Sequence, residues 1–354
     1  MHVRACLAAV ATLIALPVAA AGLEDAQYRR MNQDMVERHI VPRYQAFAAA
    51  AADLAAAADA CAAGPDGLRP AFDDALDAWM AVQHIRSGPV GFGMRGERIH
   101  YWPDRRGTGG RQLDQMLALR PENITAESLA GGSVALQGFP ALERLLTTEA
   151  EDGLDTFECG FAAAIADNLA VLGAELVADW TGPDGEAGII ATAGDPESFY
   201  PSARDVSADI YRGLYEALQI TSQDRLAAPL GSSIDNARPR LAELWRSGRS
   251  VRNLTVSLQG MVDLFAGGDG YGFEDALVET GNGTLAEAIR TKLEAAIGIA
   301  EALPLPLPDA VADPEMRPQV ERLHALVDGV REHVGAELGG ALGLPMGFNS
   351  LDGD

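Results

Sequence analysis

The chain has 354 residues, 48% of them hydrophobic and 22% charged, and its formal net charge is −24 at pH 7. A surface this acidic repels nucleic acid and anionic lipid, so neither is expected as a partner. The charge is compatible with attracting cations or a basic protein, although solubility alone also accounts for it.

The first 21 residues have the features of a secretory signal peptide. Arg4 precedes an apolar run at 6–18 that ends in small residues, an order typical of cleaved signals. The run is shorter than the roughly 20 apolar residues that a spanning helix needs. We expect cleavage near Ala20 to Gly22 and export to the cell envelope. Removing residues 1–21 takes away Arg4 and no acid, so the mature net charge becomes −25. No later stretch is expected to span a membrane.

Helical periodicity dominates the rest of the chain, and strand alternation is almost absent. The clearest case is 157–180, where apolar residues recur every three or four positions from Phe157 to Trp180. Pro42 should kink the first helix, because a proline inside a helix removes a backbone donor and crowds the preceding turn. We predict helices at 24–60, 70–86, 157–180, 206–218, 239–247, 251–265, 285–303 and 320–338.

Four segments rich in Gly and Pro separate these helices, at 88–110, 182–201, 267–283 and 305–318. The second lies near the midpoint and predicts a junction between two helical-bundle halves, 22–185 and 186–354. A repeated tripeptide, Leu-Gln-Gly at 136–138 and at 258–260, gives weak support for two related halves. The predicted fold class is therefore all-α.

Cys61 and Cys159 are the two cysteines left after the signal. In an oxidising compartment such a pair predicts a disulfide, with free buried thiols as the alternative. The two residues fall at the end of the first helix and at the start of the 157–180 helix. A bundle can bring these helix edges together, so we predict the disulfide.

Other short motifs carry little chemistry. A G-x-G-x-x-G at 91–96 follows a helix instead of a strand, so we interpret it as a loop. E-x-x-H occurs at Glu97 with His100 and at Glu321 with His324. Di-iron bundles use this spacing but add paired carboxylates, and no such pattern accompanies it. We interpret the two motifs as a loop and a solvated helix face.

Five blocks together resemble the imelysin family. They read A-W-M-A-V-Q-H-I-R-S-G-P at 78–89, Y-W-P-D at 101–104, L-A-A-P-L-G at 226–231, E-L-W-R-S-G at 243–248 and G-F-N-S-L-D-G-D at 347–354. The resemblance runs from about Tyr28 to the last residue. It implies two helical bundles with a site at their interface, in an exported bacterial protein.

The family includes iron-regulated envelope proteins, relatives of iron-uptake components and members described as metallopeptidases. Its signature G-x-H-x-x-E falls here on 138–143, where Pro140 occupies the histidine position. Proline has no ligating group, so only Glu143 remains of that pair. The resemblance therefore does not carry peptidase activity to this chain, and we do not expect an enzyme.

The resemblance and the residue types give two sets of site candidates. The binding candidates are His84, Arg86, Glu143 and Asn349, and the metal candidates are Glu143, Asp352 and Asp354. Each has an ordinary alternative: a charge at a helix N-terminus for Glu143, helix C-terminal caps for His84 and Arg86, and a frayed tail for the last residues. We favour a cap for Arg86 and leave His84 open.

The expected function is a periplasmic imelysin-like binding component in iron or other metal acquisition, with a divalent metal or iron as cofactor. Its partners would be the metal ion or envelope iron-uptake proteins. One alternative is a divergent metallopeptidase whose third ligand is His84 or His100. Another is an acidic interaction module without metal. The site should lie between the halves near Glu143, with 347–354 folded back toward it.

Overall fold

A computed structural model describes residues 22–61, 67–147 and 154–345. The signal segment and the closing segment, with Asn349, Asp352 and Asp354, lie outside the described residues. All regular elements within the described ranges are helical, as predicted.

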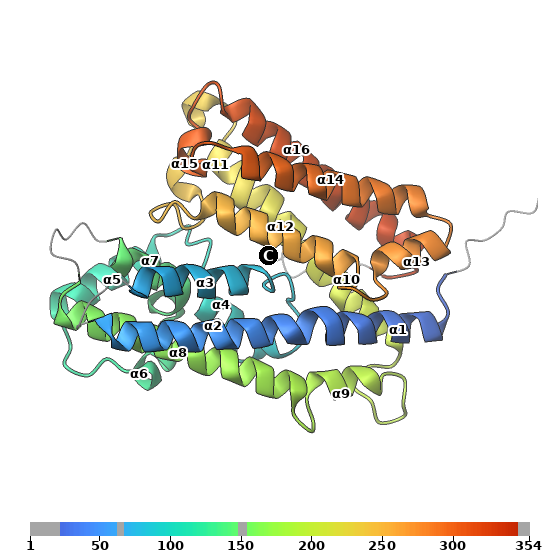
Figure 1. Cartoon of the computed structure of the whole chain (residues 1–354), viewed down its shortest axis with the longest axis horizontal. Helices are drawn as coiled ribbons and strands as arrows, with labels where there is room; N and C mark the ends of the chain where they lie inside the picture. The colour runs from blue at the N-terminus through green and yellow to red at the C-terminus, as the bar shows by residue number, and fades with distance from the viewer. Residues whose placement is uncertain (1–21, 62–66, 148–153, 346–354) are drawn as a thin grey trace, which may run out of the picture.

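Nine helices of eleven or more residues lie in the described ranges, arranged as Figure 1 shows. They are α1 (Asp25–Met35), α2 (Val41–Asp59), α3 (Leu68–Met80), α5 (Thr108–Leu119), α8 (Thr156–Thr181), α10 (Ala203–Ile220), α12 (Ser250–Phe265), α14 (Gly283–Ala302) and α16 (Arg317–His333). Shorter helices connect them: α4 (Arg95–Ile99), α6 (Ala126–Ala130), α7 (Gly138–Leu146), α9 (Glu186–Ala191), α11 (Ala228–Leu230), α13 (Phe273–Glu279), α15 (Leu307–Ala310) and α17 (Gly339–Ala341).

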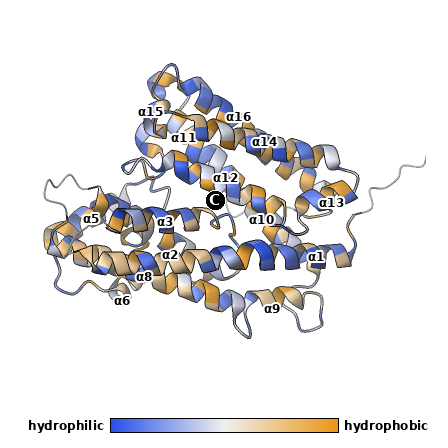
Figure 2. Cartoon of the chain, in the orientation of Figure 1, coloured by the Kyte–Doolittle hydropathy of each residue, from blue (hydrophilic) through white to orange (hydrophobic). Residues whose placement is uncertain are grey.

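Two groups of helices lie against each other. Helices α2, α3 and α8 pack together in one group, and α12, α14 and α16 pack together in the other (Figure 1). Helix α3 contacts α12, and α1 leaves the first group to pack on α10. Figure 2 shows α2 and α8 mainly in hydrophobic colours and α1 mainly in hydrophilic ones, consistent with α2 and α8 forming the interior of the first group.

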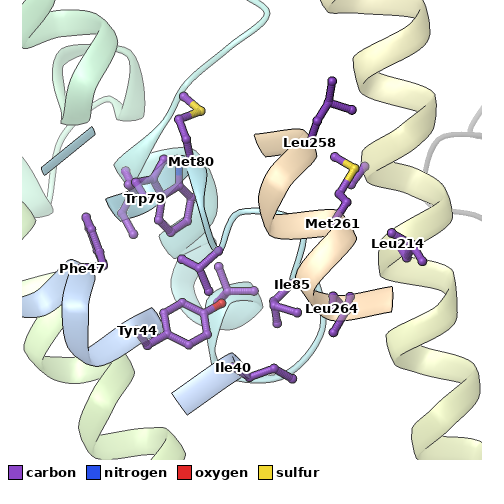
Figure 3. Packing of buried hydrophobic residues seen from close by; sticks show 14 of the residues in the cluster. Ile40, Tyr44, Phe47, Trp79, Met80, Ile85, Leu214, Leu258, Met261 and Leu264 are labelled. Atoms are coloured by element: carbon purple, nitrogen blue, oxygen red, sulfur yellow. The ribbon is translucent and has the colours of Figure 1, made fainter. Parts of the chain in front are cut away.

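Apolar side chains from both groups meet in one core. Figure 3 shows Tyr44 and Phe47 of α2 near Trp79 of α3, with Met261 of α12 and Leu214 of α10 across from them. None of these five is more than 3% exposed. The two groups are thus joined by shared hydrophobic burial, which is the main favourable term in folding.

Most predicted helices are present with ends shifted by a few residues. Helix 70–86 is shorter than predicted, because α3 ends at Met80 and a turn follows at 81–84. The breaker-rich segments hold α4, α9, α13 and α15. The predicted helix at 239–247 is wrong: only a 3-10 turn forms there, at Pro239–Leu241.

A π-helical turn, Val36–Ile40, joins α1 to α2 just before Pro42. A second, Thr221–Ala227, joins α10 to α11 just before Pro229. A third, Val334–Leu338, joins α16 to α17 with no proline directly after it. In the first two, because proline offers no N–H to the preceding turn, the helix widens ahead of it. The disturbance predicted at Pro42 therefore takes the form of a widened turn.

The predicted disulfide between Cys61 and Cys159 is present, with the two Cα atoms 5.6 Å apart. It ties the end of α2 to the first turn of α8, the two helices with the most extensive mutual packing.

One described segment, Thr156–Ala191, is long and apolar enough by length and composition to cross a membrane, contrary to the prediction that none would be. Core helices of soluble proteins pass the same test. Helix α8 fits that description, because Ile165, Leu169 and Leu172 are 0% exposed inside the bundle.

The repeated tripeptide does not mark equivalent positions. Residues 136–138 lead into the start of α7, whereas 258–260 lie in the middle of α12. The proposed boundary at 185/186 falls between α8 and α9, and α9 packs on both α8 and α1. The division into 22–185 and 186–354 stays a prediction.

Candidate functional site

A cavity of about 860 Å³ lies where the two predicted halves face each other. One wall comes from the 101–110 segment and α7, and the other from 223–228 and 238–246. The cavity volume is within the range of small-molecule sites.

Glu143 lines this cavity and is 2% exposed. Its Oε1 accepts one hydrogen bond from the Ser247 backbone N–H, at 2.8 Å, and another from the Ser247 hydroxyl, at 2.7 Å. Burial raises the pKa of the Glu143 carboxyl, while the Ser247 hydrogen bonds and the charge of Arg246 act in the opposite direction. The side chain therefore fastens α7 to the opposite wall of the cavity.

The 138–143 segment is shaped by a close backbone approach. Gly138 has φ +71°, and a Cβ there would lie 2.1 Å from the Ile99 carbonyl oxygen. This contact sets the start of α7 directly against α4. Glu143 falls past the first turn of α7, so a helix N-terminal dipole does not explain its position. Pro140 lines the same cavity as Glu143.

A buried charged network lies beside the cavity. Glu243, 1% exposed, accepts hydrogen bonds on Oε1 from the His100 Nε2, at 3.0 Å, and from the Arg225 guanidinium, at 3.1 Å. Burial by itself would raise the pKa of the Glu243 carboxyl, but Arg225 and His100 outweigh it and lower that pKa to about 2. Arg225 also donates to Gln83 and to Ser257. The network joins segments from both predicted halves.

His100 and Arg225 line a second, smaller cavity of about 350 Å³. Trp102, Pro103, Arg105 and Asp224 line both cavities. The two spaces therefore adjoin each other at these residues.

These contacts explain why 239–247 is not a helix. Leu244 has φ +45°, which turns the chain so that Glu243 points to His100 while the Ser247 N–H reaches Glu143. A continuous helix would use the Ser247 N–H within itself. Tertiary hydrogen bonds to two buried carboxylates have overridden the local helical pattern.

His84 lies outside both cavities and forms a pair with His39. The two Nε2 atoms are 2.8 Å apart, and neither residue is more than 1% exposed. Arg43 donates to His39 Nδ1 at 3.1 Å, which assigns the proton of neutral His39 to Nε2 and makes His84 Nε2 the acceptor. Burial lowers the pKa of His84 to about 3 and also holds the pKa of His39 well below 6.5. Both imidazoles are therefore neutral at pH 7.

Arg86 does not cap a helix as predicted. Its Nε donates to Glu216 of α10 at 3.0 Å, and the side chain lines the smaller cavity. An ion pair thus links the two predicted halves at this point.

The described residues offer no metal centre at Glu143. Nowhere in 22–61, 67–147 and 154–345 do three or more His, Cys, Asp or Glu side chains gather as a metal would require. Arg246 and Ser247 are the groups that act on Glu143 most directly. The other two metal candidates, Asp352 and Asp354, lie outside the described residues, so that ligand set stays a prediction.

The E-x-x-H motifs do not act as paired ligands. The His100 Nε2 forms a hydrogen bond with Glu243 and not with Glu97. The His324 Nε2 lies 3.3 Å from the Ser222 hydroxyl oxygen.

Sequence reasoning missed His39, Arg225, Glu243 and most of the cavity arginines. His39 and Arg225 both lie in π-helical turns shortly before a proline, which is a signal that could have identified them. Glu243 lies in the E-L-W-R-S-G block, within the segment 239–247 for which the sequence predicts a helix. Of the four binding candidates, the structure puts Glu143 in the larger cavity and Arg86 in the smaller one.

Comparison with known proteins gives consistent matches. The family described as Imelysin matches residues 40–333. Iron-regulated protein A from Synechococcus elongatus is 22% identical over 244 residues, which cover 66% of this chain and 63% of that protein. The chain thus spans less than two thirds of the length of this relative.

Two solved structures share the fold. An imelysin-like protein from Psychrobacter arcticum superposes with a TM-score of 0.77 at 20% identity, covering 94% of this chain and all of the other. A candidate iron-regulated protein A precursor from Parabacteroides distasonis gives a TM-score of 0.73 at 14% identity, with coverage of 91% and 97%.

Proposed function

Because the chain belongs to the imelysin family, we propose that it is an exported periplasmic protein that binds a small ligand in iron or other metal acquisition and does not cleave peptides. The observation that carries the proposal is the cavity of about 860 Å³ lined by both halves, with buried Glu143 on its wall. Such a cavity between two packed groups of helices is a usual location for a ligand site.

Two further observations support export and an iron connection. The disulfide between Cys61 and Cys159 fits an oxidising compartment, and the chain is similar to Iron-regulated protein A. The sequence features of residues 1–21 agree with this location.

The non-peptidase part of the proposal rests on ligand chemistry. Zinc hydrolases hold the metal with about three protein ligands and leave one position for water. Pro140 supplies no ligand, and the charge next to Glu143 is the cationic Arg246.

Purified mature protein, residues 22–354, tests the proposal in two measurements. Thermal unfolding with added iron(III), supplied as a salt and as its citrate chelate, should show a rise in the melting temperature, since a ligand that binds only the folded state stabilises it. A peptidase assay on unstructured casein should show no cleavage. Cleavage that disappears in Glu143→Ala, or a melting temperature unaffected by every form of iron, would contradict the proposal.

One observation favours the metallopeptidase alternative. The His100 Nε2 donates a hydrogen bond to Glu243. Histidines that bind a metal through one ring nitrogen commonly donate a hydrogen bond to a carboxylate from the other. Zinc-dependent cleavage abolished by His100→Ala would select that alternative.

A further inference from the structure

The larger cavity has a charge opposite to that of the whole chain. Its lining includes five arginines, Arg105, Arg144, Arg238, Arg240 and Arg246, and three carboxylates, Asp104, Glu143 and Asp224. The chain itself carries a net charge of −24. The positive charge of the cavity lining therefore does not follow from the overall charge and needs an explanation within the cavity.

All three carboxylates are already engaged by other groups. Asp104 accepts the backbone N–H groups of Thr108 and Gly109, and Asp224 pairs with Arg105 at 2.6 Å. Glu143 accepts both hydrogen bonds from Ser247. None of these three forms an ion pair with the other four arginines of the lining, although the charge of Glu143 acts on Arg246 at longer range.

Those four arginines, Arg144, Arg238, Arg240 and Arg246, form what we call the arginine cluster. An ion pair requires a carboxylate oxygen within 4.0 Å of a guanidinium nitrogen. Within the described ranges, none of these four arginines has a carboxylate oxygen that close. Elsewhere most arginines have such a partner, as Arg43 has Asp263 and Arg95 has Asp179. An unpaired arginine is thus not the usual state in this acidic protein.

Three arginines of the cluster have identified neighbours: Arg240 and Arg246 lie near Trp245, and Arg144 lies over Gly110. The Arg240 and Arg246 guanidinium carbons lie 5.6 Å and 4.4 Å from the centre of the Trp245 ring, within the range of cation–π attraction. Arg144 lies over Gly110, where a Cβ would come within 2.7 Å of its guanidinium nitrogens. A glycine at that position therefore gives the Arg144 side chain its space.

The arginines also repel one another. Burial lowers the pKa of Arg246, and the charges of Arg144 and Arg240 lower it further, while Glu143 and Asp114 act in the opposite direction. An anion placed among these groups would relieve the repulsion and supply the acceptors that their N–H groups lack.

We propose that the larger cavity binds a small polycarboxylate, free or as its iron(III) chelate, through the arginine cluster. Arginine presents planar, forked donors that match carboxylate geometry in pairs. Several arginines around one cavity favour a ligand with several carboxylates, and Trp102 and Trp245 supply apolar walls for its carbon skeleton. This inference rests on the proposed function and names the ligand class for the same cavity.

Calorimetric titration of the mature protein tests the inference. The probes are citrate, iron(III) citrate and inorganic phosphate, at low and at physiological ionic strength. Citrate and its iron(III) chelate should bind, and their affinity should fall as salt is added, because the cluster is partly exposed. Phosphate should bind at least tenfold more weakly, since one small anion reaches only part of the cluster.

The double variant Arg240→Gln with Arg246→Gln should weaken citrate binding by roughly a hundredfold, at about tenfold for each charged hydrogen-bond donor lost. Arg144→Gln should weaken it by about tenfold. The matched control is Arg322→Gln, an exposed arginine of α16 outside the cavity, which removes one positive charge and should leave the affinity unchanged.

The possible results separate the two proposals. Iron that raises the melting temperature without any citrate binding, or citrate binding that survives the double variant, would overturn the polycarboxylate site and leave the proposed function intact. Phosphate binding more tightly than citrate would also overturn the ligand class. Failure of iron, citrate and the chelate alike would overturn both.

Discussion

Glu143 accepts two hydrogen bonds from Ser247 through a single oxygen, Oε1. The effect of these hydrogen bonds on stability can therefore be tested separately from the effect of the negative charge. A glutamine at this position keeps that acceptor, whereas an alanine leaves the partly buried Ser247 N–H without one. A buried donor left unpaired costs about 1–3 kcal/mol.

We therefore expect Glu143→Ala to lower the free energy of unfolding by about 2 kcal/mol, and Glu143→Gln to change it by less than about 1 kcal/mol. Urea unfolding of the two variants measures the difference. Because Glu143→Gln also removes a negative charge from the cavity, it should strengthen citrate binding. Equal destabilisation by both variants would mean that the charge, and not the hydrogen-bond acceptor, is what the fold requires.

The His39–His84 pair makes stability depend on pH. Burial lowers the pKa of His84 to about 3 in the folded protein, against about 6.5 in an unfolded chain. Between these values the unfolded state binds more protons, so stability is fully present above pH 6.5 and is lost as the pH falls toward 3. At pH 4.5 the loss from this residue is roughly 3 kcal/mol.

The variant His84→Gln should lose less stability than the wild type when the pH is lowered from 7 to 4.5. The quantity to compare is the change in unfolding free energy between the two pH values, which is insensitive to any constant cost of the substitution. His333→Gln, on the partly exposed end of α16, is the control and should behave as the wild type. An identical acid response in all three proteins would contradict the neutral, buried pair.

Helix α7 presents Pro140 and Glu143 to the same cavity. They are three residues apart, a spacing at which side chains on a helix are neighbours. A histidine at 140 would therefore stand next to Glu143 and could share a metal ion with it.

We expect Pro140→His to create or strengthen zinc binding, measured by calorimetry, while Pro140→Ala, which removes the ring without adding a ligand, should not. If Pro140→His remains folded and its zinc affinity equals that of Pro140→Ala, the cavity lacks the further donors that a metal site needs.

At the same scale, 239–247 and the two π-helical turns show what governs individual elements. The 239–247 segment has helical apolar spacing, yet its donors and carboxylates are used by partners more than a hundred residues away, such as Glu143 with Ser247 and His100 with Glu243. Two of the three π-helical turns in the described residues lie just before Pro42 and Pro229, which are visible in the sequence, whereas the third, Val334–Leu338, has no such proline.

For the whole molecule, the disulfide is the main covalent constraint. Cys61 and Cys159 are 98 residues apart in sequence, and closing a loop of this size stabilises the folded state by about 4 kcal/mol in the chain-entropy description, with smaller measured gains common.

The double variant Cys61→Ser with Cys159→Ser should unfold at a lower urea concentration than the oxidised wild type, by up to about 4 kcal/mol in free energy. Reduction of the wild type should produce a similar loss, whereas the variant should not respond to reductant. A wild type equally stable in its oxidised and reduced forms would contradict this stabilising role.

The helical class, most of the long helices, the family and the disulfide could all be predicted from the amino-acid sequence. Apolar side chains at helical spacing, as from Phe157 to Trp180, must be buried whatever their partners. The sequence also indicated Glu143, because this residue lies in a recognisable motif, and the family resemblance indicated a site between the two predicted halves.

The polar groups that contact one another could not be predicted, because their contacts depend on how the helices pack. His39 with His84, Glu243 with His100 and Arg225, and the arginine cluster each join residues from separate segments. Their pairing depends on how α3, α7, α10 and α12 pack, and no local periodicity encodes that packing. The unpaired state of the cluster in particular becomes apparent only after the carboxylates around it are found engaged elsewhere.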